Sequence, residues 1–125
     1  MALILIVEDE EQVLVLADAV FKDAGHETLL ATSYDGAVAL LSEGRRPDLA
    51  FIDRNLGEGL TGIDFAREAR RAHPDIQVLY TSDDLVTDGM RAMFVERAEY
   101  LPKPYSPDQI IEAANALLAR SPDAE

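Results

Sequence analysis

The chain has 125 residues, of which 48% are hydrophobic and 28% charged, so it suits one globular domain and leaves no room for two. Its formal net charge of −13 argues against direct binding to nucleic acid or to an anionic membrane surface, because both need a positive stripe. The absence of cysteine excludes a disulfide framework and thiolate chemistry, which fits a reducing, cytoplasmic compartment. The apolar start, "MALILIV", is too short to span a membrane and runs directly into acidic residues, so no signal peptide is expected.

Apolar runs and helical spacing alternate along the first half of the chain. Residues 2–7 predict a buried strand, and Gly25 ends the helical stretch that follows them. The apolar face of this helix is expected to consist of Val13, Leu16, Ala17, Val20 and Phe21. Residues 27–31 predict a second strand, and Ser33 is placed to cap the next helix. The apolar stripe of that second helix is Ala37, Leu40 and Leu41.

The second half of the chain continues this alternation. Further strands are expected at residues 48–52, 76–80 and 98–101. Helices are expected at residues 63–72 and 85–97. The first of these must end near Pro74, and the second is weakened by Gly89. Ser106 caps the last helix, whose inward face is expected to be Ile110, Ile111, Ala114, Leu117 and Leu118.

Five strands that alternate with five helices define the expected fold class. The strands are apolar on both faces, which is typical of a parallel sheet covered by helices on each side. Right-handed crossovers then favour a doubly wound α/β fold. We therefore expect a five-stranded parallel sheet of the flavodoxin-like type, with strand order 2-1-3-4-5 and helices on both faces.

Polar residues follow several of these strands where they end. Glu8 and Asp9 end the first strand, Asp53 the third and Thr81 the fourth, while the fifth leads into Lys103. Carboxyl ends of parallel strands share one edge, so these side chains are expected to converge there. Three carboxylates within ~5 Å repel by roughly 3 kcal/mol per pair at an effective dielectric near 20, which points to a bound cation. Oxygen ligands of this kind suit Mg2+, and an ionised aspartate beside it can attack phosphorus.

Four segments together resemble a known family. "LILIVEDE", "LAFIDRNL", "VLYTSDD" and "YLPKPYS" carry an acidic pair, a strand-end aspartate, a strand-end threonine and a Lys-Pro pair in one order and spacing. In these features the chain resembles the receiver domain of two-component response regulators, over nearly its whole length. The resemblance implies that a sensor histidine kinase or histidine phosphotransfer protein transfers a phosphoryl group onto Asp53.

The resemblance also implies roles for the residues around Asp53. Asp9 and Asp53 would ligate Mg2+ directly, the backbone carbonyl of Asn55 would be a third ligand, and Glu8 would act through water. Lys103 would pair with the phosphoryl oxygens and Thr81 would hydrogen-bond one of them. Tyr100 matches the switch aromatic of the family, and the Lys103-Pro104 bond is usually cis.

The loop after Asp53 departs from the family pattern. The usual proline four residues on is Gly57, and the usual glycine eight residues on is Thr61, with Gly62 one place later. The loop is therefore expected to be one residue longer and more flexible. Arg54 and Asp83 flank the route of a hydrolytic water and are expected to affect the acyl-phosphate lifetime in a direction that the sequence leaves open.

The expected organisation is a receiver domain at residues 1–120 followed by a tail at residues 121–125. We expect a stand-alone phosphoacceptor switch that catalyses its own phosphorylation and dephosphorylation, is not an enzyme for outside substrates and signals through a downstream protein partner. One alternative is a metal-dependent phosphohydrolase, although such enzymes typically carry a second carboxylate where this chain has Asn55. The other is a binding module of the same fold whose altered loop has abolished phosphorylation.

Overall fold

The structure, a computed structural model, describes residues 2–56, 61–83 and 86–120. The strands are β1 (Leu3–Val7), β2 (Glu27–Ala31), β3 (Leu49–Asp53), β4 (Gln77–Ser82) and β5 (Glu99–Pro102). The helices are α1 (Glu11–Asp23), α2 (Tyr34–Ser42), α3 (Gly62–Ala72), α4 (Asp88–Arg91) and α5 (Pro107–Leu118).

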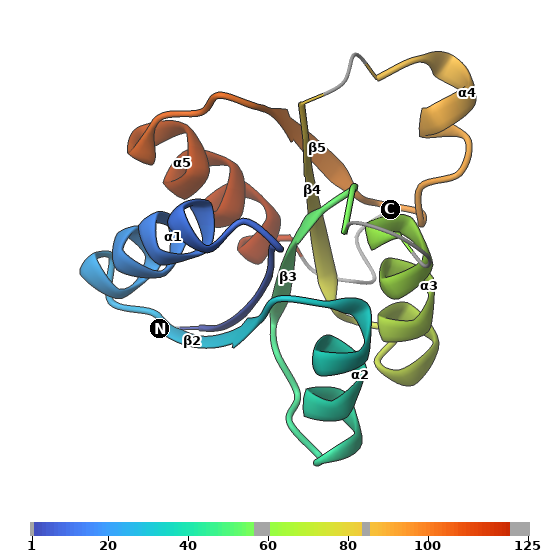
Figure 1. The fold of residues 1–125 in the computed structure, drawn as a ribbon, viewed down its shortest axis with the longest axis horizontal. Helices are drawn as coiled ribbons and strands as arrows, with labels where there is room; N and C mark the ends of the chain where they lie inside the picture. The colour runs from blue at the N-terminus through green and yellow to red at the C-terminus, as the bar shows by residue number, and fades with distance from the viewer. Residues whose placement is uncertain (1, 57–60, 84–85, 121–125) are drawn as a thin grey trace.

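The five strands form one parallel sheet in the order β2-β1-β3-β4-β5. Helices α1 and α5 lie against one face of this sheet, and α2 and α3 lie against the other (Figure 1). The predicted doubly wound fold and its strand order are therefore confirmed.

Alternate residues of the three central strands, β1, β3 and β4, supply two separate hydrophobic cores. On β1, for example, Leu5 and Val7 pack with α2 and α3, whereas Ile4 and Ile6 pack with α1 and α5. Successive side chains of a strand point to opposite faces, so a strand buried on both faces reads as a continuous apolar run. This explains why the central strands could be recognised from the sequence.

Side-chain caps start four of the helices, α2, α3, α4 and α5. Ser33 accepts a hydrogen bond from the Gly36 amide at the start of α2, as expected. Ser106 likewise caps α5, and Gln109 completes the capping box. Thr61 caps α3, where its amide donates to Asp64 Oδ2 at 2.8 Å. Each cap satisfies amide groups that have no partner within the helix.

Two details of the helices differ from the prediction. Leu16 was expected on the buried face of α1 but is 48% exposed, because Leu14 occupies that face with Ala17 and Phe21. Leu16 follows Leu14 by two residues, which turns it about 200° around the helix axis. The helix expected at residues 85–97 is regular only over Asp88–Arg91 in the described part of the chain.

The segment after α4 is held by contacts to other elements instead of helical hydrogen bonds. The Val95 amide donates to the Tyr80 hydroxyl at 3.2 Å. Arg67 and Arg70 of α3 donate to the backbone carbonyls of Met93 and Glu96. Gly89 also lowers the helical propensity of the segment. Together these contacts explain why the helix is shorter than its sequence spacing suggested.

Gly62 brings the chain back to the end of β3 at the start of α3. Its amide donates to the Arg54 carbonyl at 2.9 Å. A Cβ at this position would lie 2.1 Å from the Asp53 carbonyl oxygen, so only glycine fits. The longer, more flexible loop expected around Gly57 falls on residues 57–60, which lie outside the described residues. No helix in the described part of the chain is long and apolar enough to cross a membrane.

Candidate functional site

Neighbouring strands deliver the predicted polar side chains to the carboxyl edge of the sheet. Asp53 is the last residue of β3 and lies opposite Thr81 of β4 in the strand register. Both follow Phe51 and Leu79 by two residues and therefore lie on the α1 and α5 side of the sheet. The Arg54 amide donates to the Thr81 carbonyl at 2.8 Å, which extends the strand pairing past Asp53.

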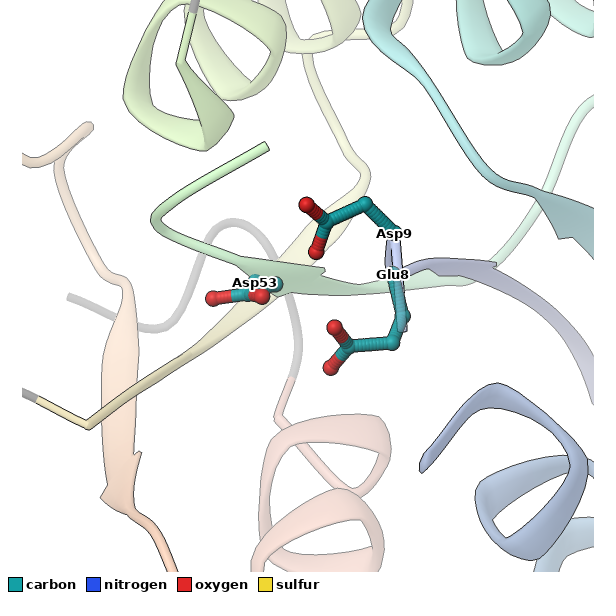
Figure 2. A group of neighbouring side chains, drawn as sticks. All are labelled: Glu8, Asp9 and Asp53. Carbon is teal, nitrogen blue, oxygen red and sulfur yellow. The ribbon is translucent and has the colours of Figure 1, made fainter. Parts of the chain in front are cut away.

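Three carboxylates gather at this edge. Glu8, Asp9 and Asp53 each offer an oxygen, and these oxygens all lie within 4.8 Å of one another. Figure 2 shows Glu8 and Asp9 extending from the end of β1 around the carboxylate of Asp53 at the end of β3. Glu8 and Asp53 are buried, with 3% and 4% of their surface exposed, whereas Asp9 is exposed. The cluster is thus open to solvent on the Asp9 side.

Lys103 is the cation that the structure itself brings to these carboxylates. Its Nζ lies 3.1 Å from Glu8 Oε1, 3.4 Å from Asp53 Oδ2 and 3.8 Å from Glu10 Oε1. The side chain of Lys103 is 8% exposed. A buried ammonium group is costly unless carboxylates compensate its charge. These contacts therefore hold the ammonium group of Lys103 beside Glu8 and Asp53.

One ammonium does not balance the acidic charge of the site. Burial raises the pKa of Glu8 to about 8, and the adjacent Asp53 adds to the rise. Burial alone lowers the pKa of Lys103, but the carboxylates of Glu8 and Asp53 outweigh it and raise that pKa above its ordinary value. The crowded carboxylates raise the pKa of Glu8 because the site has too little positive charge. A hard cation such as Mg2+ would supply that charge, and carboxylate oxygens are the ligands it prefers.

Asn55 lies beside the cluster, with its backbone close to Asp53. Its amide donates to Asp53 Oδ1 at 3.1 Å, and its side chain is exposed. This hydrogen bond orients the Asp53 carboxylate from the loop side. The structure therefore brings Asn55 together with all three carboxylates and Lys103.

Thr81 and Tyr100 occupy opposite faces of the sheet. Thr81 is 1% exposed, and its buried Oγ1 has no hydrogen-bond partner among the described residues. Tyr100 pairs with Tyr80 across β4 and β5 and packs on the α2 and α3 side, where the Arg91 guanidinium lies 5.5 Å from its ring centroid. The switch role of Tyr100 remains a prediction.

The Lys103-Pro104 peptide bond is cis, in agreement with the expectation. The sequence also left two neighbours of Lys103 unassigned to the site. The exposed carboxylate of Glu10 lies 3.8 Å from Lys103 Nζ. The buried hydroxyl of Tyr105 lies within electrostatic reach of Glu8. The signal that could have found Tyr105 is its place two residues after the lysine.

The comparison with protein families agrees with this geometry. A model of the response regulator receiver domain matches residues 4–115. This match covers most of the chain, so the chain belongs to the family of response regulator receiver domains. It is accordingly a signal-transduction domain of the two-component type.

Individual relatives support this assignment. Response regulator SaeR of Staphylococcus aureus is 30% identical over 118 residues, which are 94% of this chain and 50% of that protein. The chain therefore spans about half the length of the curated relatives it matches. A solved receiver domain of NtrX from Brucella abortus is 29% identical with a TM-score of 0.82, covering 94% of this chain and 99% of the other. A receiver protein from Sinorhizobium medicae WSM419 is 27% identical with a TM-score of 0.86, covering 93% of each chain.

Proposed function

We propose that this chain is a phosphoacceptor switch that takes a phosphoryl group from a sensor histidine kinase or a histidine phosphotransfer protein onto Asp53. The observation that carries the proposal is the convergence of three carboxylates with Lys103 at one sheet edge. Asp53 is the proposed acceptor because its carboxylate, at the end of β3, lies beside those of Glu8 and Asp9 and 3.4 Å from Lys103 Nζ.

The chain supplies positions for each part of the transfer. An oxygen of Asp53 forms a bond to phosphorus as the P–N bond of the donor phosphohistidine breaks, and the leaving imidazole takes up a proton. Lys103 already contacts Asp53 Oδ2 and can neutralise a phosphoryl oxygen. Thr81 Oγ1, buried without a partner in the described residues, is free to donate to another.

The residues at this edge fit Mg2+ as the cofactor. Asp9, Asp53 and the Asn55 carbonyl would be direct ligands, and Glu8 would act through a water molecule. When bound, the ion neutralises charge on the transferred group. The acidic cluster with its raised Glu8 pKa supports this assignment.

The output of the switch is a change in protein contacts. We expect Tyr100 to turn inward when Thr81 moves toward the phosphoryl group, which would alter the face built by α4, β5 and α5. The domain of residues 1–120 would then bind a downstream protein in the cytoplasm, with no direct contact to nucleic acid or membrane. The chain would catalyse its own phosphorylation and dephosphorylation and would not act as an enzyme on outside substrates.

The experiment that tests this function is phosphorylation with Mg2+ and a small acyl phosphate, read by intact mass. Wild type is expected to gain one phosphoryl group, and Asp53→Asn to gain none. Asp23→Asn, which changes an exposed aspartate of α1, is the matched control and should behave as wild type. Labelling of Asp53→Asn would show that another residue is the acceptor. Failure of wild type to label would favour the non-phosphorylated binding module, and turnover of a phosphate ester would favour the phosphohydrolase.

Thr81→Ala tests the coupling between phosphorylation and output. This variant is expected to accept the phosphoryl group on Asp53 but to lose several-fold in phosphorylation-dependent partner binding, because a ligand shifts a two-state equilibrium only through differential contacts. Binding of the downstream partner to phosphorylated and unphosphorylated protein measures the difference. Unchanged coupling would contradict the role of Thr81 as a switch residue.

A further inference from the structure

Two hydroxyl groups are buried at this site without a hydrogen-bond partner in the part of the chain that the structure describes: those of Thr81 and Tyr105. The proposed function uses the first and leaves the second without a role. A buried hydroxyl that lacks a partner costs free energy, and native proteins leave few of them unsatisfied. The Tyr105 hydroxyl is therefore expected to gain a partner in another state of the site.

Tyr105 lies on the same side of the sheet as the carboxylates. Its ring packs edge-on against Phe51, with 5.7 Å between the ring centroids. Phe51 precedes Asp53 by two residues on β3, so the two side chains share a face. Tyr105 also lines a groove of about 300 Å³ together with Lys103, Asp83 and Glu10.

The electrostatic environment of the phenol agrees with a position beside the acidic cluster. Burial raises the pKa of Tyr105 to about 12, and among the charged groups Glu8 contributes most to that rise. Lys103, Asp53 and Asp83 act on the phenol more weakly. The hydroxyl is thus protonated at neutral pH and available as a donor to an acidic side chain of this cluster, such as Glu8.

The Glu8 carboxyl group has two partners in this structure, and we expect it to lose one of them, Lys103, on phosphorylation. The Glu10 amide donates to Glu8 Oε2 at 3.2 Å, and Lys103 Nζ contacts Glu8 Oε1 at 3.1 Å. A phosphoryl group on Asp53 would present new anionic oxygens to Lys103. When Lys103 turns to those oxygens, Glu8 Oε1 is left buried without a donor, which is costly for a carboxylate.

We propose that Tyr105 is a positioning residue of the phosphoryl site, whose hydroxyl donates to Glu8 Oε1 when Lys103 engages a phosphoryl group on Asp53. The inference rests on the proposed function. Exchange of one donor for another keeps the Glu8 side chain oriented beside Asp9 and Asp53. The Tyr105 hydroxyl makes this hydrogen bond only in the phosphorylated state.

Tyr105→Phe tests the proposal because it removes the hydroxyl and keeps the ring. Thermal unfolding is measured without metal and with Mg2+ plus beryllium fluoride, a phosphoryl mimic. The metal-free variant is expected to be as stable as wild type or more stable, since an unpaired buried hydroxyl is gone. Its half-saturating beryllium fluoride concentration is expected to rise about fivefold or more. Tyr34→Phe, a half-buried tyrosine of α2, is the matched control and should change neither.

A double-mutant cycle with Glu8→Gln assigns the effect to Glu8. In the Glu8→Gln background, Tyr105→Phe is expected to have a smaller effect on mimic affinity than in wild type. An equal effect in both backgrounds, or an unchanged affinity of Tyr105→Phe for beryllium fluoride, would overturn this inference and leave the proposed function standing. Equal destabilisation of the metal-free and mimic-bound forms would show a purely structural role and overturn it too. A wild type that ignores the mimic would overturn the proposed function together with the inference.

Discussion

At the scale of single residues, Gly62 shows how close packing positions Asp53, the proposed phosphoacceptor. The carbonyl of Asp53 occupies the space in which a side chain at residue 62 would begin. The start of α3 therefore presses directly against the end of β3, and the position of Asp53 depends on a residue nine places further along the chain.

Gly62→Ala is expected to lower the free energy of unfolding by about 2 kcal/mol or more, because the new methyl group must displace backbone atoms. Urea denaturation measures this, and labelling by an acyl phosphate should slow in parallel as Asp53 shifts. Gly89→Ala is the matched control: a Cβ there meets nothing closer than 3.8 Å, and alanine favours the helix. Equal stability of Gly62→Ala and wild type would contradict the close approach.

At the scale of the elements, the segment between α4 and β5 depends on its neighbours. Tyr80 is fully buried on β4, its ring lies 4.3 Å from that of Phe94, and its hydroxyl accepts the Val95 amide. The residue next to Thr81 on the same strand thus holds the segment on which the expected output face is built.

Tyr80→Phe is expected to loosen this segment without emptying the core, since the ring is kept and only the hydroxyl is lost. The Val95 amide loses its acceptor, which should cost about 1–3 kcal/mol and accelerate its hydrogen exchange. Amide exchange followed by NMR makes the measurement, with Tyr34→Phe as the control. Unchanged protection of Val95 would argue against the hydrogen bond to Tyr80.

The same elements show what the sequence could and could not predict. Strands β1, β3 and β4 were recognisable because burial on both faces leaves continuous apolar runs, and a shared carboxyl edge then implied that Asp53 and Glu8 meet. The extent of α4 was mispredicted because Arg67, Arg70 and Tyr80 hold the following segment from distant parts of the chain. Tyr105 was missed because nothing in its local sequence reveals that its hydroxyl is buried.

At the scale of the whole molecule, ionisation of the buried Glu8 lowers the free energy of unfolding of the metal-free protein. Glu8 keeps its proton up to about pH 8 in the folded chain, whereas its ordinary pKa is 4.5. Folding therefore takes up a proton between these two pH values. The stabilisation is complete below pH 4.5 and is lost as the pH rises through about 8.

The metal-free protein is accordingly expected to lose about 4 kcal/mol more than Glu8→Gln as the pH rises from about 5 to about 8.5. Chemical denaturation in chelator at a series of pH values measures the difference. Addition of Mg2+ should reduce it, because cation binding favours ionised ligands. Parallel pH profiles for wild type and Glu8→Gln would contradict the raised pKa of Glu8.

The hydrogen bond between the Gly62 amide and the Arg54 carbonyl gives this chain tolerance to changes of length. It joins the residue that follows β3 to the first residue of α3, which fixes the two ends of the connection between them. The entropic cost of closing a flexible loop grows only with the logarithm of its length. An insertion or deletion of one residue there changes the loop and leaves the anchored ends, including Asp53, where they are. We therefore expect this chain to tolerate a change in the surface of the loop while the proposed acceptor stays in place.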